Sequence, residues 1–150
     1  MKKVLLISLA FLMLGFNSFA GWEMLNPKYG QNPYNSVFFA DQNYGYAVGQ
    51  IGAIIKTNNG GTTWHKLVSG TTMDLHSVWF THADTGYAVG YDANSGGVCK
   101  TTDGGATWVT INLGSYFFLE SVCFANTKTG FASGTHGSDG VIVKTTALMG

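Results

Sequence analysis

Arginine is absent from this chain of 150 residues, and its eight lysines balance eight acidic residues to a formal net charge of zero. A nucleic-acid-binding surface needs concentrated positive charge, so no nucleic-acid partner is expected. Proline and cysteine occur only twice each, and no nucleophile elbow or phosphate-binding loop is present. No stretch after residue 20 repeats apolar residues at the helical period. These absences argue against a helical fold and against the common hydrolase and nucleotide-binding motifs.

The one long apolar run lies at the N-terminus. A basic start at Lys2 and Lys3 precedes it, and a small, polar end follows it, with Ser18 and Ala20 at the positions that a signal peptidase inspects. The run is shorter than the ~20 residues that a membrane span needs. We therefore predict that residues 1–20 are a signal peptide cleaved after Ala20. The mature domain, 21–150, would be exported to the periplasm or the extracellular space and would keep no membrane span.

Three copies of one unit fill the rest of the chain. Each copy opens with Ser-Val-x-Phe, continues with a glycine-flanked Gly-(Tyr/Phe)-Ala run and then reaches a Lys-Thr pair. The copies begin at Ser36, Ser77 and Ser121, so they are 41 and then 44 residues apart. A period of this length is typical of repeat proteins, in which each unit buries its apolar face against its neighbours.

Each copy contains short β-branched and aromatic runs separated by Gly, Asn and Asp, which predicts four antiparallel strands. Four strands in about 40–45 residues is the size of one propeller blade. The predicted fold is all-β, a partial β-propeller of three four-stranded blades, in which the last unit has lost its fourth strand. The strands are expected at 36–40, 45–49, 53–57 and 63–68, at 77–81, 86–90, 97–101 and 107–112, and at 121–125, 130–134 and 141–145.

The turn between the third and fourth strands carries the most specific motif, Thr-x-(Asp/Asn)-x-Gly-x-Thr-Trp. In such a turn the Asp or Asn side chain accepts hydrogen bonds from turn amides, glycine takes a positive φ, and threonine ties the strand ends together. The residues expected to hold the two turns are Thr57, Asn59, Gly61, Thr63, Trp64, Thr101, Asp103, Gly105, Thr107 and Trp108.

These turns resemble Asp-boxes, the BNR repeats of bacterial sialidases, sortilin-type receptors and related propellers. The whole unit, over residues 22–146, most resembles the photosystem II assembly/stability factor family, a Ycf-type propeller that recurs in many exported bacterial proteins. The resemblance implies a binding or scaffold role in photosynthesis, with a thylakoid-lumen location if the host is an oxygenic phototroph. Sialidases hold a substrate carboxylate with arginines, and the assembly factors are expected to use an arginine-bearing face. This chain has no arginine for either purpose.

Loops on one face of the propeller form the candidate ligand surface. The stretch 114–118 is aromatic where the first unit has small polar residues at 70–74, and the loops 91–95 and 135–139 are longer than the loop 50–52. An aromatic surface of this kind suits a protein or glycan ligand. Alternatively, Phe117 or Phe118 fills the gap between blades. The predicted binding residues are Tyr91, Asp92, Asn94, Tyr116, Phe117, Phe118, His136 and Asp139.

The function that these features favour is an exported, non-enzymatic binding or scaffold propeller. No catalytic residue and no cofactor is predicted, and the histidines and cysteines lack metal-ligand spacing, so no metal is expected. The alternative is a secreted Asp-box glycoside-acting enzyme or a carbohydrate-binding module. A glycosidase needs two carboxylates that face one pocket, and Asp92 and Asp139 are the candidates for that pair.

The two cysteines align with apolar positions of the other units. Cys99 aligns with Ile55 and Val143, and Cys123 aligns with Phe38 and Trp79. We therefore expect two buried free thiols. The alternative, which export would permit, is a disulfide between neighbouring blades.

Both ends of the repeat array depart from its pattern. Trp22 aligns with the tryptophans of the two Asp-boxes, which predicts an additional fourth-type strand at 21–27 that is available for ring closure. At the other end, Lys144-Thr145-Thr146 begins an Asp-box that the following residues, 147–150, do not continue. A closed ring uses about four to eight blades, so we expect either further C-terminal blades or a homodimer of two three-bladed chains.

Overall fold

The computed structural model describes residues 18–19, 21–25 and 32–146, and in these ranges every regular element is a strand. Most of the predicted signal peptide, residues 26–27 of the predicted closing strand and the irregular end at 147–150 lie outside the described residues. The strands are β1 (Ser18–Phe19), β2 (Trp22–Glu23), β3 (Tyr34–Phe39), β4 (Gly45–Gly49), β5 (Ile54–Thr57), β6 (His65–Leu67), β7 (Asp74–Phe80), β8 (Gly86–Tyr91), β9 (Ser95–Thr101), β10 (Val109–Ser115), β11 (Phe117–Phe124), β12 (Thr129–His136) and β13 (Asp139–Thr146).

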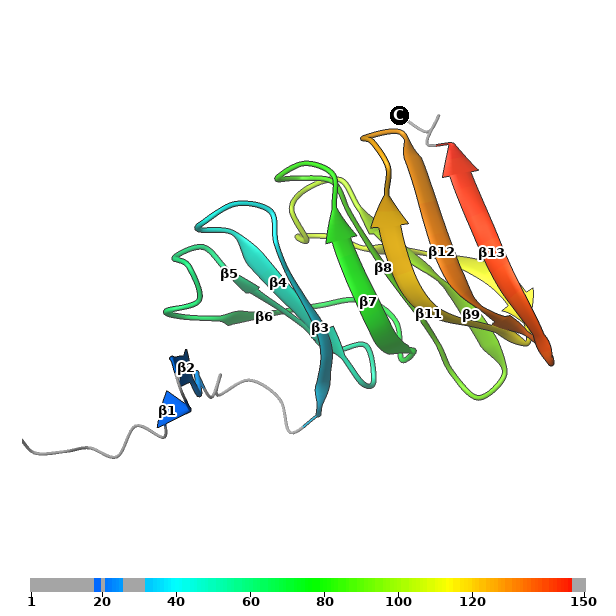
Figure 1. Ribbon diagram of the computed structural model, residues 1–150, viewed down its shortest axis with the longest axis horizontal. Coiled ribbons are helices and arrows are strands. Elements are labelled where there is room, and N and C mark those ends of the chain that lie inside the picture. Colours follow the sequence, from blue (N-terminus) through cyan, green and yellow to red (C-terminus); the bar gives the residue numbers. More distant parts are fainter. Residues whose placement is uncertain (1–17, 20, 26–31, 147–150) are drawn as a thin grey trace, which may run out of the picture.

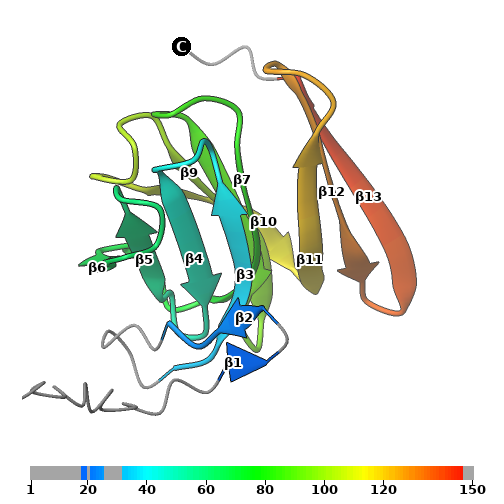
Figure 2. The ribbon, with the colours of Figure 1, turned by 60° about the vertical axis from the view of Figure 1, so that its left-hand side comes forward.

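The strands β3 to β13 form three antiparallel sheets that confirm the predicted all-β blade architecture. Blade 1 has the order β3-β4-β5-β6, blade 2 has β7-β8-β9-β10, and blade 3 has β11-β12-β13 in the described residues, without a fourth strand. Figure 1 shows the three blades side by side, with the small β1–β2 sheet next to blade 1 and β13 at the opposite end. In the turned view, the sheets lie face to face (Figure 2).

Apolar residues on the facing sides of the blades form the core. Between blades 1 and 2, Tyr46 stacks on Phe80 with ring centroids 3.7 Å apart, and Val48 and Ile54 belong to the same buried cluster. Between blades 2 and 3, Tyr87 lies 4.4 Å from Phe124 in a second cluster with the buried Val89, Leu119, Val122 and Ala132. Each blade is thus stabilised mainly by its neighbour, as expected for a repeat protein.

The glycine that opens each Gly-(Tyr/Phe)-Ala run is required by a close approach and not by a positive φ. A Cβ built on Gly86 would lie 2.4 Å from Cζ of Phe80, and one on Gly130 would lie 2.5 Å from Cζ of Phe124. The phenylalanine that ends the first strand of each blade therefore lies across the glycine of the second strand. This contact explains why the Ser-Val-x-Phe and Gly-(Tyr/Phe)-Ala segments recur together.

Several strands of blades 2 and 3 are longer than the repeat pattern predicts. The prediction of an aromatic loop at 114–118 is wrong. Only Tyr116, at φ 65°, separates β10 from β11, and Phe117 and Phe118 begin β11. The expected loop at 135–139 shrinks to residues 137–138, with Gly137 at φ 63°. The β12–β13 hairpin continues its ladder outward because a two-residue turn with a positive-φ glycine suits the twist of paired strands.

The cysteine prediction is half correct. Cys99 is a fully buried free thiol, and Cys123 is also free but exposed. Trp79, at the matching position of blade 2, packs against the core that blade 2 shares with blade 3. Cys123 faces onward from blade 3 in the same way, and among the described residues no further blade follows to cover it.

Candidate functional site

The strand ends of blades 2 and 3 bring the predicted binding residues to one edge of the molecule. This edge, here called the aromatic rim, comprises 74–76, 91–95, 116–120 and 136–139, at the lower ends of β7, β8, β11 and β12 in Figure 1. Strand pairing places Tyr91 opposite Asp74, and Phe117 opposite His136. All eight predicted binding residues therefore lie on this rim.

The central contact of the aromatic rim is a cluster around Tyr91. Its ring stacks on His76 at 4.5 Å with an interplanar angle of 9°, and it meets Phe118 edge-on at 5.0 Å. The Tyr91 hydroxyl donates a hydrogen bond to Glu120 Oε1 at 3.0 Å, and His76 Nδ1 lies 3.0 Å from Glu120 Oε2. Burial first, and then the Glu120 carboxylate, raise the pKa of Tyr91, so its hydroxyl remains a donor at neutral pH.

Sequence reasoning missed His76 and Glu120 as members of this cluster. Their signal is the repeat register, because each comes directly before the Ser-Val that opens its blade, 44 residues apart. The equivalent residue of blade 1, Asn35, donates from Nδ2 to the carbonyl of Leu75 at 2.9 Å. A polar residue at this register position thus joins the first strand of one blade to that of the next.

Tyr116 connects blades 2 and 3 through its backbone and leaves its side chain in solvent. Its N–H donates to the Asn94 carbonyl at 3.2 Å, and its own carbonyl accepts from the Gly137 N–H at 3.0 Å. The side chain is 63% exposed, whereas Phe117 and Phe118 are half-buried. Phe117 stacks on His136 at 4.4 Å. Phe118 contacts Tyr91 of blade 2, as the gap-filling alternative expected, and Tyr116 is the aromatic side chain most available to a ligand.

Asp92 of the aromatic rim is held in its ionised form by its own turn. Asp92 Oδ1 accepts the N–H groups of Asn94 and Ser95, both at 2.9 Å, and these backbone hydrogen bonds lower the pKa of Asp92. A carboxyl held ionised in this way is a turn cap and a poor proton donor. Asp139 is exposed at the start of β13, opposite His136.

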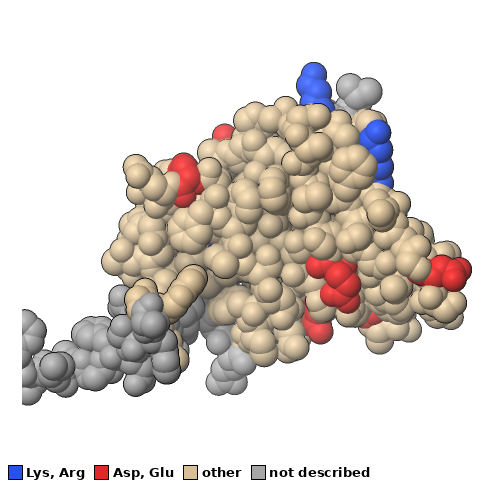
Figure 3. Space-filling model, in the orientation of Figure 1, with Lys and Arg blue, Asp and Glu red and all other residues tan. Residues whose placement is uncertain are grey.

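Charge is distributed unevenly between the two edges of blades 2 and 3. The aromatic rim carries Asp74, Asp92, Glu120 and Asp139, and no lysine of the described residues lies in its four segments. The described lysines of these blades, Lys100, Lys128 and Lys144, lie at the other ends of the strands. Figure 3 shows acidic side chains low on the right of the molecule and basic side chains at the upper right.

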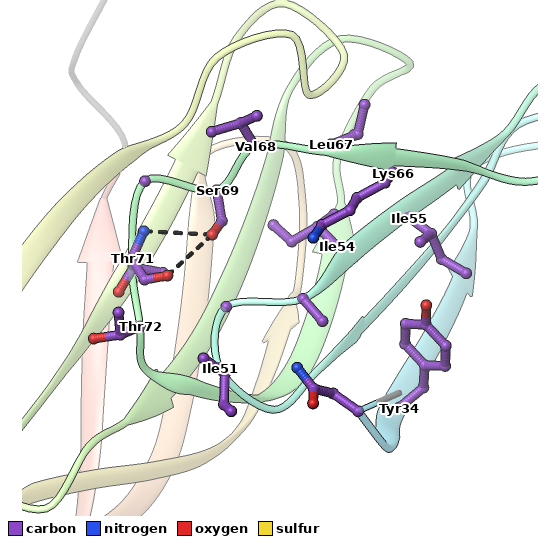
Figure 4. Close-up of a pocket in the computed structure, with 14 residues that line it drawn as sticks. Tyr34, Ile51, Ile54, Ile55, Lys66, Leu67, Val68, Ser69, Thr71 and Thr72 are labelled. Carbon is purple, nitrogen blue, oxygen red and sulfur yellow. Dashed lines mark hydrogen bonds between the residues drawn. The ribbon is translucent and has the colours of Figure 1, made fainter. Parts of the chain in front are cut away.

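A separate cavity of about 330 Å³ lies on blade 1 (Figure 4). Tyr34, Ile51, Lys66 and the segment 67–72 contribute to its lining, which includes no carboxylate among the described residues. Ile51 has φ 54°, an unusual value for a β-branched residue, and its N–H donates to Asp74 Oδ1 at 2.8 Å. None of the predicted binding residues lines this cavity, and it offers no pair of acids for glycoside hydrolysis.

The Asp-box turns have a closed set of hydrogen bonds. Asp103 Oδ1 accepts from the Thr107 N–H at 2.9 Å and from Thr101 Oγ1 at 2.8 Å, and Oδ2 accepts from Thr107 Oγ1. These hydrogen bonds, of which the one from the Thr107 hydroxyl has the largest effect, lower the pKa of Asp103 to about 2. In blade 1, Asn59 accepts from the Thr63 N–H and donates to Thr63 Oγ1, both at 2.8 Å. Paired glycines at φ 67° and 89°, or 66° and 88°, complete the turns.

The Asp-box turn of blade 2 is also a contact between blades. The Gly104 carbonyl accepts hydrogen bonds from Lys56 Nζ at 2.8 Å and from the Tyr46 hydroxyl at 3.0 Å, both from blade 1. Lys56 Nζ also lies 5.3 Å from the centre of the Tyr46 ring. The Lys-Thr pair and the Gly-Tyr-Ala run of one blade therefore hold the turn of the next blade.

Neither a metal site nor a membrane helix is found in the described part of the chain. Over 18–19, 21–25 and 32–146, no group of three or more His, Cys, Asp or Glu side chains is placed to hold a metal ion. In the same residues, no helix has the length and apolar character needed to cross a membrane.

Comparison with known proteins identifies the family. The family model of the photosynthesis system II assembly factor YCF48 matches residues 16–117. The fold is similar to that of YCF48 bound to D1 peptide, at 22% identity and a TM-score of 0.63, over 77% of this chain and 37% of that one. It is also similar to YCF48 from Cyanidioschyzon merolae, at 20% identity and a TM-score of 0.61, over 77% of this chain and 38% of that one.

A third solved structure, that of an ancestral GH74 enzyme, matches at 19% identity and a TM-score of 0.63, over 77% of this chain and 17% of that one. At such identities the structural likeness shows the fold alone, and the chain spans less than half the length of each of the three. Comparison with curated protein sequences finds no match. Because the family model covers more than half of the chain, this protein belongs to the β-propeller family of the photosynthesis system II assembly factor YCF48.

Proposed function

We propose that this chain is an exported, non-enzymatic binding module that holds a segment of another protein along the aromatic rim. The observation that carries the proposal is Tyr116, whose ring is 63% exposed while hydrogen bonds to Asn94 and Gly137 fix its backbone between two blades. A rigid, exposed aromatic side chain supplies contact area at a low cost in conformational entropy.

The chemistry of the aromatic rim suits a peptide that carries positive charge. Glu120 and Asp139 are exposed in the same segments as the stacked Phe117 and His136, and no described lysine lies among these segments. Complementary charge across an interface favours the correct partner and speeds its association. Within the YCF48 family one structure holds a D1 peptide, which supports a peptide as the ligand class here.

A glycan is the second candidate ligand, because an exposed tyrosine and a Phe–His stack also form a surface on which a sugar ring can lie. Catalysis on that glycan is less well supported. Asp92 caps its own turn in the ionised form, so it is a poor acid partner for Asp139.

The proposal can be tested by measuring how a fluorescently labelled D1 peptide, and the same peptide with added lysines, bind to the chain. We expect Tyr116→Asn to weaken binding by about tenfold, a typical effect of removing an aromatic anchor. Asparagine tolerates a positive φ, so the turn is retained. The matched control is Tyr44→Asn, which removes a 40% exposed tyrosine from a turn at the other edge.

Two outcomes would overturn the proposal. One is peptide binding that Tyr116→Asn leaves unchanged, or no binding of either peptide. The other is turnover of chromogenic glycosides that disappears in Asp139→Asn, which would establish the enzyme alternative.

A further inference from the structure

An apolar cavity of about 250 Å³ lies between blades 2 and 3. Ile111 and Leu113 of β10 and Tyr87 of β8 line one wall, and Phe124 and Val143 of blade 3 line the other. Ile111 is 40% exposed, although its side chain lies on the side of blade 2 that faces blade 3. The cavity thus leaves part of the apolar contact between blades 2 and 3 uncovered.

One blade earlier, a tryptophan occupies the matching position. Trp108 is buried in the cluster between blades 1 and 2, edge-on to Phe80 at 6.1 Å. The residues around it correspond one by one to the lining of the cavity: Tyr46, Val48, Ile54, Leu67, Val78, Phe80, Ala88 and Cys99 stand 41 or 44 residues before Tyr87, Val89, Val98, Ile111, Val122, Phe124, Ala132 and Val143. The cavity therefore corresponds in its lining to the site that Trp108, just before the fourth strand of blade 2, occupies between blades 1 and 2.

In the described part of the chain, the edge of blade 3 beside this cavity is also unpaired. β13 pairs with β12 along eight residues, and among the described residues no strand pairs with its other edge. An unpaired edge strand presents a row of backbone donors and acceptors to any additional strand.

The segment from Trp22 to Leu25 already lies where a fourth strand would precede blade 1. Leu25 Cδ1 lies 3.5 Å from the position of a Cβ built on Gly61. One blade later, Leu67 Cδ1 lies 2.7 Å from a Cβ built in the same way on Gly105. Leu25 therefore packs on the turn of blade 1 as Leu67 packs on the turn of blade 2. Trp22 is three residues before Leu25, as Trp64 is before Leu67, and its side chain is 81% exposed. This segment therefore covers blade 1 with its leucine and leaves its tryptophan in solvent.

We propose that the Trp22–Leu25 segment of a second copy of this chain pairs with the open edge of β13 and places its tryptophan in the cavity. β2 lies beside blade 1 and β13 at the other end of the row of blades (Figure 1), so the chain's own Trp22 is far from its own cavity. Reciprocal exchange between two copies gives a closed, two-fold ring of six blades, within the usual propeller size. It also covers Ile142, which is 74% exposed on the outer face of blade 3.

The exchange replaces only a small amount of existing structure. β2 is paired with β1 through two residue pairs, Ser18 with Glu23 and Phe19 with Trp22. Both residues of β1 precede the predicted cleavage point after Ala20, so processing would free that edge of β2 for β13.

Light scattering and sedimentation of the full chain, with the expected signal peptide removed by export, test the proposal. We expect a dimer, and we expect Trp22→Ala and Ile111→Lys each to raise its dissociation constant by at least about tenfold, as removal of a central aromatic contact does. Thr127→Lys, which adds the same charge to an exposed turn of blade 3, should leave the dimer unchanged.

Mixing the two defective variants distinguishes exchange from misfolding. The ring has two junctions, and at each one Trp22 of one copy enters the cavity of the other. A dimer of either variant alone is defective at both junctions. In a mixed pair, Trp22 of the Ile111→Lys chain enters the unchanged cavity of the Trp22→Ala chain, so one junction stays intact. The mixture should therefore associate more tightly than either variant alone. A monomeric parent chain with a cooperative thermal transition would overturn the proposal. A dimer that neither substitution weakens, or a mixture with no gain in association, would do the same.

Discussion

Asp103 and Asn59 hold the same turn in two adjacent blades with different side-chain chemistry. Both accept the N–H of the threonine four residues later, but only Asp103 carries a titratable group. The hydroxyl and amide donors around Asp103 stabilise the carboxylate, which is why its pKa falls to about 2. The aspartate at this residue position is therefore expected to be structural and to make the turn of blade 2 sensitive to acid.

The expected result follows from the sign of that shift. A carboxyl whose pKa is lower in the folded chain contributes stability that is complete above its unfolded pKa, near 4. That stability is lost as the pH falls from about 4 through the folded pKa of about 2. The thermal midpoint of the parent chain should therefore fall more steeply over this range than that of Asp103→Asn, which copies the turn of blade 1. Circular dichroism melts across that range measure the difference, and parallel curves for the two chains would contradict the assignment.

At the scale of the element, the close packing of a phenylalanine on a glycine determines how the first two strands of a blade pair. Gly86 faces the Phe80 ring, and three ring atoms would lie within 2.6 Å of an added Cβ. The same contact recurs in the other two blades, with distances from 2.5 to 2.9 Å. The repeat therefore encodes strand pairing through shape as well as through alternation of polar and apolar residues.

Gly86→Ala should lower the free energy of unfolding by about 1–3 kcal/mol, because the added methyl group forces the Phe80 ring out of a packed core. Denaturant unfolding with a tryptophan fluorescence signal measures this change. The control is Gly140→Ala in β13, where an added Cβ meets nothing within 4 Å. Equal stability of the two variants would show that the ring moves away without cost.

At the scale of the whole molecule, contacts between blades rely on the side chains that the repeat keeps. Tyr46 donates to the Gly104 carbonyl of blade 2 and stacks on Phe80. Burial first, and then the charge of Asp84, raise the pKa of Tyr46 to about 12. The docking of blade 1 on blade 2 therefore depends on a protonated tyrosine.

Tyr46→Phe should cost about 1 kcal/mol at neutral pH, the usual net value of one hydrogen bond. A tyrosine with a raised pKa contributes stability that is present below its unfolded pKa, near 10, and is lost as the pH rises toward about 12. As the pH rises, the free energy of unfolding of the parent chain should thus fall faster than that of Tyr46→Phe, and the difference between the two chains should shrink. Chemical denaturation at neutral pH and above about pH 10 tests this expectation. A difference in the free energy of unfolding that stays constant with pH would contradict it.

The sequence by itself determined the blades of this protein. Local chemistry is enough for that, because a period of 41 and 44 residues, the turn motif and the β-branched runs each act within one unit. Trp22 could likewise be aligned with Trp64 and Trp108 from spacing alone. The eight candidate binding residues were also found in this way, since their loops differ from those of the first unit.

Only the tertiary structure decided how these parts meet. The His76–Glu120 contact joins strands of different blades, and the exposure of Cys123 depends on which face has a neighbour. The change of Phe117 and Phe118 from expected loop to strand results from hairpins that extend beyond the repeated motif. The cavity that matches the site of Trp108 is formed by two sheets together. Such features depend on packing between residues far apart in the chain, and a pattern within one unit does not specify them.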